Sequence, residues 1–191
     1  MKFTQIPENT FKEMQLNAGI LLTTFDPTTA TIQNSDILAA TSGGVKFDAK
    51  PTYKDLGDVV DNCPKNTKEL KKLDFWDVKM SGNMITITPA TAKKNMAAAD
   101  VDSSTNKITP RNDLESTDFE DLWWVGDYSD KNGDADGGFC AIHMMNTLST
   151  GGFSIQTADR DKGQFAFEYT AHYSTSAQDT VPFEVYIKAG A

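Results

Sequence analysis

The stretch GQFAFEYTAHY, residues 163–173, alternates apolar or aromatic side chains with mostly polar ones. The apolar side of this alternation consists of Phe165, Phe167, Tyr169, Ala171 and Tyr173. A strict period of two residues is typical of a β-strand with one buried face. A second segment repeats the pattern, and its expected buried face carries Phe183, Val185 and Ile187. The C-terminal part of the chain therefore predicts a sheet that is buried on one side.

Further segments upstream have strand character. They are residues 16–25, 45–50, the two halves of 75–88, 120–128 and 139–145. The halves of 75–88 flank Ser81-Gly82-Asn83, which the sequence allows as either a turn or a bulge. Glycine-rich turns separate the strands of the C-terminal part.

One helix is expected, over about residues 89–99. Thr88 suits the N-cap and Pro89 suits the first helical position. Ala92, Met96 and Ala99 form one small apolar stripe, which favours flat packing against a sheet. Many short strands and one helix predict a mainly β fold, a β-sandwich or partial barrel with one flanking α-helix.

The chain of 191 residues fits a single domain over residues 1–191. Two long excursions are expected within it, an extended hairpin arm at about 44–62 and an acidic loop at about 100–121. A β fold of this kind leaves free sheet edges, which a monomer must protect and an assembling protein uses.

The composition limits the function classes. The formal net charge of −9 disfavours non-specific binding to nucleic acid. Two cysteines, Cys63 and Cys140, are too few for a disulfide scaffold and match no zinc motif. The longest apolar run, Ala18 to Leu22, is too short for a membrane span, so we expect no membrane insertion and a soluble, non-secreted protein at the point of synthesis.

No catalytic motif is apparent, and the sequence predicts a non-enzyme without cofactor or metal. Asn132, Asp134 and Asp136 imitate half of a calcium loop, but His143 stands where a bidentate Glu is required. A solvated hairpin turn is therefore the favoured interpretation. His143 and His172 have no Cys, Asp or Glu at ligand spacing, and the carboxylates of the acidic loop have no neighbouring group to separate their pKa values.

Adjacent tryptophans, Trp123 and Trp124, lie on an expected strand. Neighbouring strand residues point to opposite faces, so one indole is expected in the core and the other outward. An outward Trp is more often an interface anchor than a sugar-stacking platform. We name both residues as interface anchor candidates and keep a carbohydrate-binding β-sandwich module or adhesin as the alternative function.

A resemblance covers nearly the whole chain. The segments that carry it are QLNAGILL (15–22), DNCPKNTKEL (61–70), WDVKMSG (76–82), NKITPRND (106–113), LWWVGD (122–127), NTLSTGGFS (146–154), GQFAFEYTAHY (163–173) and VPFEVYI (181–187). In number and order these segments resemble the major tail tube proteins of long, non-contractile-tailed bacteriophages (siphophages) of Gram-positive hosts.

The resemblance implies a structural subunit of the virion tail, synthesised in the cytoplasm of the host bacterium. Members fold as a β-sandwich with a flanking helix and an extended arm, and they form hexameric rings that stack into a hollow tube. The implied partners are further copies of the chain, a tape-measure protein, and tail-tip and tail-terminator proteins. Viral DNA passes through the lumen without specific binding. A phage-derived bacteriocin tail would leave much the same sequence signals.

Two sets of residues are candidates for these roles. The stretch 50–61 is the expected inter-subunit arm, with Lys50 and Lys54 among its alternating charges and Gly57 as its hinge. An ordinary surface loop is an equally favoured interpretation of the same stretch. For the lumen the candidates are Asp55, Asp58 and Asp61, with the acidic residues at 113–121 as the rival set.

Overall fold

The computed structural model describes residues 5–10, 12–128 and 137–189, and this part of the chain is mainly β, with 49% strand and 12% helix. The strands are β1 (Gln15–Leu22), β2 (Ile37–Ala39), β3 (Thr41–Asp55), β4 (Lys71–Met84), β5 (Ala99–Asp102), β6 (Lys107–Pro110), β7 (Glu120–Tyr128), β8 (Gly138–Ser149), β9 (Phe165–Ala171) and β10 (Phe183–Lys188). The helix is α1 (Pro89–Met96), and the short 3₁₀ turns are η1 (Asn34–Asp36), η2 (Leu56–Val59), η3 (Lys68–Leu70) and η4 (Ser116–Asp118).

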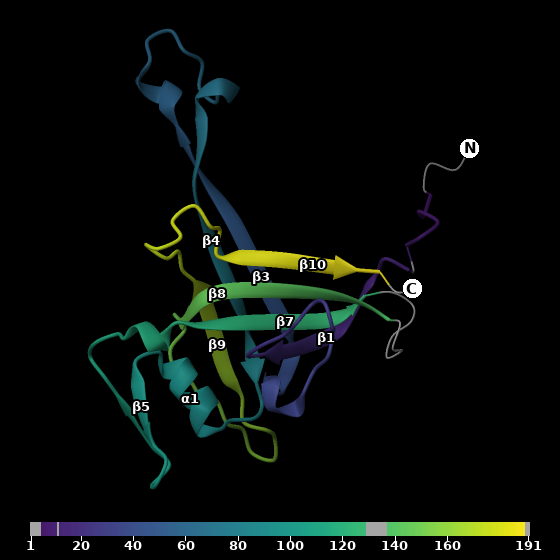
Figure 1. The fold of residues 1–191 in the computed structure, drawn as a ribbon, viewed down its shortest axis with the longest axis vertical. Coiled ribbons are helices and arrows are strands. Elements are labelled where there is room, and N and C mark those ends of the chain that lie inside the picture. Colours follow the sequence, from purple (N-terminus) through teal and green to yellow (C-terminus); the bar gives the residue numbers. More distant parts are fainter. Residues whose placement is uncertain (1–4, 11, 129–136, 190–191) are drawn as a thin grey trace.

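One large antiparallel sheet has the strand order β2-β1-β7-β8-β9-β4-β3. It divides at β8, whose residues 139–144 pair with β10 and whose residues 147–149 pair with β9. As a result β1, β7, β8 and β10 form one layer, and β3, β4 and β9 cross it as a second layer (Figure 1). The chain passes from β2 into β3 through Ala40, so the two ends of the strand order are joined by the chain itself. The predicted mainly β fold with one helix is confirmed.

The main core lies between the two layers. The buried faces of β4, β8 and β9 meet there, as period-two strands require. In β9 the predicted face of Phe165, Phe167, Tyr169 and Ala171 is buried. The residue that continues this face beyond the strand, Tyr173, is exposed, and its hydroxyl accepts a hydrogen bond from the backbone N–H of Trp76 at 3.0 Å.

The expected buried face of β10 is only partly buried, which corrects the sequence analysis. Phe183 packs against Phe47 and Trp76, with ring centroids 5.8 and 5.4 Å away. Farther along the strand, Ile187 is 63% exposed and Val185 is exposed as well. The reason is the position of β10 at an edge of its layer, where it pairs with β8 alone. Alternation predicts which residues share a face, but it does not say how far the opposing layer extends.

Helix α1 begins as its sequence predicts. The Thr88 hydroxyl accepts a hydrogen bond from the backbone N–H of Thr91 at 3.2 Å, and Pro89 occupies the first turn. The helix ends at Met96, three residues before the expected end, because Ala97 has a φ of 62°. Its buried residues are Thr91, Ala92 and Asn95, so the face toward the sheet is more polar than the expected apolar stripe.

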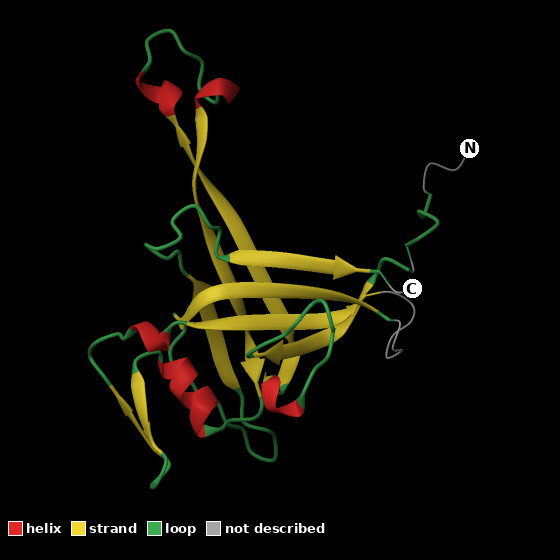
Figure 2. Cartoon of the chain, viewed as in Figure 1, coloured by secondary structure: helices red, strands yellow, loops and turns green. Residues whose placement is uncertain are grey.

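The hairpin of β3 and β4 extends beyond both layers as an arm, tipped by η2 and η3 (Figure 2). The arm predicted at residues 44–62 covers only the outgoing strand of the observed arm and half of the observed tip. The returning strand, from Lys71, is part of β4. Residues 81–83 lie inside β4 and pair regularly with β9, so the turn is wrong. The irregularity in the β3–β4 pair lies between Ser42 and Val45, where β3 carries the extra residues Gly43 and Gly44, so the bulge is on the neighbouring strand and not at 81–83.

The acidic segment at 100–121 is more ordered than the expected loop. Strands β5 and β6 pair as a separate hairpin, and η4 follows it. Arg111 holds the segment together through ion pairs with Asp100 at 3.0 Å, Glu115 at 3.3 Å and Asp118 at 2.7 Å. The sequence analysis missed this hairpin because its strands have only four residues each.

The strands expected on either side of the acidic turn, β7 and β8, pair with each other as predicted. The turn itself, with Asn132, Asp134 and Asp136, lies outside the described residues. Among the helices that the structure describes, none has the length and apolar content needed to cross a membrane.

Candidate functional site: the extended arm and the polar network

The tip of the arm is folded by its own contacts. The carboxylate of Asp55 accepts hydrogen bonds from the backbone N–H of Gly57 at 2.9 Å and from that of Asn66 at 2.8 Å. The hydrogen bonds from Asn66 and then Gly57 lower the pKa of Asp55. Lys71, at the start of the returning strand, donates to Asn66 at 3.2 Å. One carboxylate therefore joins the two sides of the tip.

Gly57 lies buried in this tip, and its expected role as a hinge stays a prediction. A Cβ at this position would stand 3.1 Å from a carboxylate oxygen of Asp55 and 3.2 Å from the sulfur of Cys63. Its φ lies outside the left-handed region. The glycine is thus explained by close packing at the end of the arm, and the arm joins the body through two continuous strands.

Apolar side chains along the arm face solvent. Val59 at the tip is 89% exposed, and Leu56 and Val60 beside it are also exposed. The strands below the tip add Tyr53, Leu73 and Phe75. An exposed apolar group of this extent is typical of a surface that is covered by a partner.

The other arm candidates lie on the same element. Lys50 and Lys54 are exposed on β3. Of the lumen candidates, Asp58 and Asp61 are exposed at the tip, and Asp55 is half-buried in the hydrogen bonds described above. The structure therefore places these candidates along the arm, with Lys50 near the body and the three aspartates at the tip.

The two tryptophans face opposite sides of the sheet, as predicted. Trp124 packs against the main core and donates a hydrogen bond from its indole N–H to the carbonyl oxygen of Ala18 at 3.0 Å. Trp123 is 7% exposed in a second apolar cluster, where its ring stacks on His143 at 4.0 Å. Phe25, from the loop after β1, packs edge-on against Trp123 at 5.6 Å. Both indoles are mostly covered by the subunit itself, so the expectation that one of them points outward is wrong.

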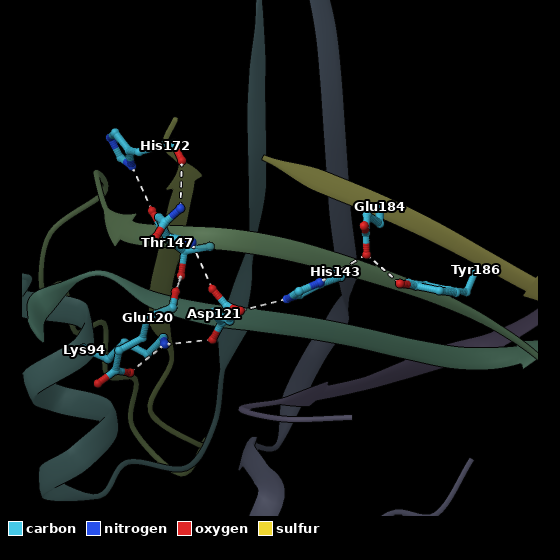
Figure 3. A network of polar contacts seen from close by, with 9 residues as sticks. Lys94, Glu120, Asp121, His143, Thr147, His172, Glu184 and Tyr186 are labelled. Atoms are coloured by element: carbon cyan, nitrogen blue, oxygen red, sulfur yellow. Dashed lines mark hydrogen bonds and ion pairs between the residues drawn. The ribbon is translucent and has the colours of Figure 1, made fainter. Parts of the chain in front are cut away.

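His143 is the centre of a polar network on the outer face of β7, β8 and β10 (Figure 3). One ring nitrogen lies 3.0 Å from the carboxylate of Asp121, and the other lies 3.6 Å from that of Glu184. The hydroxyl of Tyr186 donates to Glu184 at 2.5 Å. The second oxygen of Asp121 accepts from the backbone N–H of Asn146 at 3.0 Å.

Two further groups extend the network (Figure 3). Lys94 of α1 pairs with Glu120 at 2.8 Å, so that the helix is fastened to β7. Near the end of β8, Asn146 and His172 exchange two hydrogen bonds, both of 3.2 Å. These contacts fasten α1 and the chain after β9 to the β7–β8 pair.

Sequence reasoning missed the partners of His143 because strand register supplies them. On β8 this histidine lies directly opposite Trp123 of β7 and Glu184 of β10, and opposite residues of antiparallel strands share a face. The two carboxylates lie on opposite sides of the imidazole and do not converge on one point. Among the described residues no group of three or more His, Cys, Asp or Glu side chains is arranged to hold a metal ion. The network is suited to fastening strands to one another.

A cleft of about 490 Å³ opens beside the irregular middle of β1. Its lining includes Asn17 and Gly19, both with positive φ, together with Phe25 and Asp127. Asn17 donates to Asp127 at 2.7 Å, so the carboxylate in the lining already has a partner. The cleft is bordered by Gly137, the first described residue after the acidic turn.

The chain matches no protein-family model, and a search of the curated proteins found no match either.

Proposed function

We propose that the chain is a structural subunit that assembles with copies of itself into stacked hexameric rings, forming the hollow tail tube of a long-tailed bacteriophage. In this proposal the tube is the conduit for genome delivery, and the subunit resides in the virion tail. The basis is the resemblance of eight ordered segments, together with an architecture that is mainly β with one helix.

The observation that carries the proposal is the arm. Its two strands and folded tip project beyond the core and expose Val59, Leu56 and Val60. A monomer gains nothing from solvated apolar side chains on such a projection, whereas burial of each against a partner contributes roughly 1.5–3 kcal/mol. A second copy of the chain is the partner that self-assembly provides.

Free sheet edges support the same proposal. Strand β3 has 15 residues and pairs with β4 alone, and β10 pairs with β8 alone. Long unpaired edges are templates for pairing with another chain, and closing them in a ring removes the hazard. Within the proposal, such edges join neighbouring subunits, and DNA passes through the lumen without specific contacts.

The test is a sedimentation series on the purified protein at rising concentration. Wild type is expected to form fast-sedimenting assemblies. Val59→Asp with Val60→Asp is expected to remain monomeric, because two carboxylates cannot enter an apolar contact. As a matched control, Ile155→Asp changes an exposed isoleucine in the connection between β8 and β9 and should retain most assembly if the arm tip is the decisive surface. Monomers at every wild-type concentration, or full assembly of the arm variant, would contradict the proposal.

The alternative, a carbohydrate-binding module or adhesin, receives less support from the geometry. Sugar stacking needs an open indole face, and both Trp123 and Trp124 are engaged by their own chain. The alternative expects saturable glycan binding that is lost in Trp124→Ala, and a flat titration would end it.

A further inference from the structure

One wall of the cleft beside β1 is formed by the connection between β1 and β2, residues 23–36. The ends of this connection meet, because the backbone N–H of Thr23 donates to the carbonyl oxygen of Asp36 at 2.8 Å. Inside it, the carboxylate of Asp26 accepts a hydrogen bond from the backbone N–H of Thr28 at 2.9 Å. Compact loops whose ends meet are packed by their own side chains and are frequently functional. The connection is therefore a preformed wall.

The other wall is the outer face of β1, β7 and β8. Val125 and Asp127 of β7 are two residues apart, so they share one face of the sheet. Ile20 of β1 is paired with Val125, and Phe139 of β8 is paired with Asp127. All four residues line the cleft, together with Ile32 from the connection. Strand register therefore gathers apolar side chains around one carboxylate.

Among the lining residues that the structure describes, Asp127 brings the only charge. It is half-buried, and the amide of Asn17 donates to one of its oxygens at 2.7 Å. Because that amide is neutral, the negative charge of the carboxylate remains. Asp127 forms no ion pair in the described part of the chain. A charge beside apolar walls interacts more strongly than one in open water, so the group that complements this cleft is a cation.

The rim of the cleft already attracts one ammonium group. Lys188 of β10 is paired with Phe139, and its ammonium nitrogen lies 6.0 Å from the centre of the Phe139 ring. The face of an aromatic ring attracts cations through its quadrupole. The corner between Phe139 and Asp127 therefore suits an ammonium group, and Lys188 is a competitor for it.

Unusual backbone conformations also gather at the cleft. Three lining residues have a φ in the left-handed region, Asn17 at 61°, Gly19 at 69° and Ala30 at 52°. At Gly19 the missing side chain makes room for Trp124, since a Cβ would stand 2.5 Å from the indole. Ala30 has no side chain that favours this conformation, so its backbone is strained. Strained positions of this kind cluster at sites that hold ligands.

We propose that the cleft binds a small aromatic molecule with an ammonium group, its ring between Ile32 and Val125 and its ammonium on Asp127. The volume of about 490 Å³ lies within the roughly 300–1,000 Å³ that is typical of sites for small molecules. The site is built from the loop and the sheet of one subunit. The inference therefore goes beyond the proposed function and does not depend on it.

Equilibrium dialysis of the full chain tests the charge preference. The probes are 1-naphthylmethylammonium and 1-naphthylacetate, which share a ring system and carry opposite charges. The ammonium probe is expected to saturate, and the acetate probe to bind about tenfold more weakly, because only the former has an opposite charge at Asp127. Asp127→Asn should weaken the ammonium probe by about tenfold while keeping an oxygen acceptor for Asn17. Asp179→Asn, at an exposed aspartate between β9 and β10, is the matched control and should bind as wild type.

A second pair of variants tests the apolar wall. Ile32→Asn should weaken both probes by about threefold or more, because a polar amide replaces apolar contact with the ring. Ile87→Asn is the matched control, since both isoleucines are 39% exposed and Ile87 lies between β4 and α1. It should leave the binding of both probes unchanged.

A gain of binding provides a test that a folding defect cannot imitate. Lys188→Met removes the competing ammonium group and should tighten binding of the ammonium probe by about threefold or more. The absence of saturable binding at millimolar ammonium probe would overturn the inference. Equal binding of the two probes, or ammonium binding that neither Asp127→Asn nor Lys188→Met changes, would overturn it as well. Dialysis counts bound probe on single subunits and on assemblies alike, so these outcomes are separate from those that test the proposed function.

Discussion

At the scale of single residues, the buried polar contacts explain positions that hydrophobic patterning leaves open. The Tyr169 hydroxyl donates to the side-chain carbonyl of Asn95, joining β9 to α1 in the core. Burial, with a smaller effect of Glu120, raises the pKa of Tyr169, so the phenol remains a protonated donor at neutral pH. Asn95 is buried for this reason on a helix face where an apolar residue would be expected.

Tyr169→Phe should lower the free energy of unfolding by about 1–3 kcal/mol, because the buried amide of Asn95 loses its donor. Urea denaturation followed by tryptophan fluorescence measures the change. Tyr53→Phe removes a hydroxyl from an exposed tyrosine of the arm and should leave the stability unchanged. Equal stability of Tyr169→Phe and wild type would contradict the assigned role of the hydrogen bond.

At the scale of elements, sequence periodicity predicted those features of strands and helices that depend on residues close together in the sequence. The buried face of β9 and the start of α1 at Thr88 and Pro89 follow from side-chain alternation and capping. The returning strand of the arm was missed because Lys71, Lys72 and Asp74 interrupt any apolar alternation there. The partners of His143 come from other strands, and only the register of the sheet reveals them.

The arm tip is an element whose order should depend on pH. Backbone hydrogen bonds lower the pKa of Asp55 below 3.8, its ordinary value. A carboxylate with a depressed folded-state pKa contributes stability that is complete above the unfolded-state pKa and is lost as pH falls through the folded-state pKa. We therefore expect the backbone N–H groups of Gly57 and Asn66 to be protected from hydrogen exchange at pH 5 and to lose protection progressively in acid below about pH 4.

Asp55→Ala should remove this protection already at pH 5, with little change in the β9 core. Asp58→Ala, a neighbouring exposed aspartate of the same tip, is the matched control and should behave as wild type. Exchange measured residue by residue separates the tip from the body. Protection of Gly57 and Asn66 that persists in Asp55→Ala would show that other contacts order the tip.

At the scale of the whole molecule, the surface carries groups that the subunit itself does not cover. The exposed apolar residues of the folded arm and two strand edges have no partner within the described subunit. The net charge of −9 keeps free copies apart at low ionic strength, and salt screens this repulsion over about 8–10 Å at 0.10–0.15 M. Assembly should therefore depend on both protein concentration and salt.

Negative-stain electron microscopy of the concentrated protein in near-physiological salt tests the central claim most directly. The account predicts rings or hollow tubes of uniform width, absent from the Val59→Asp, Val60→Asp variant at the same concentration. Monodisperse single subunits, or irregular aggregates that the arm variant also forms, would contradict it.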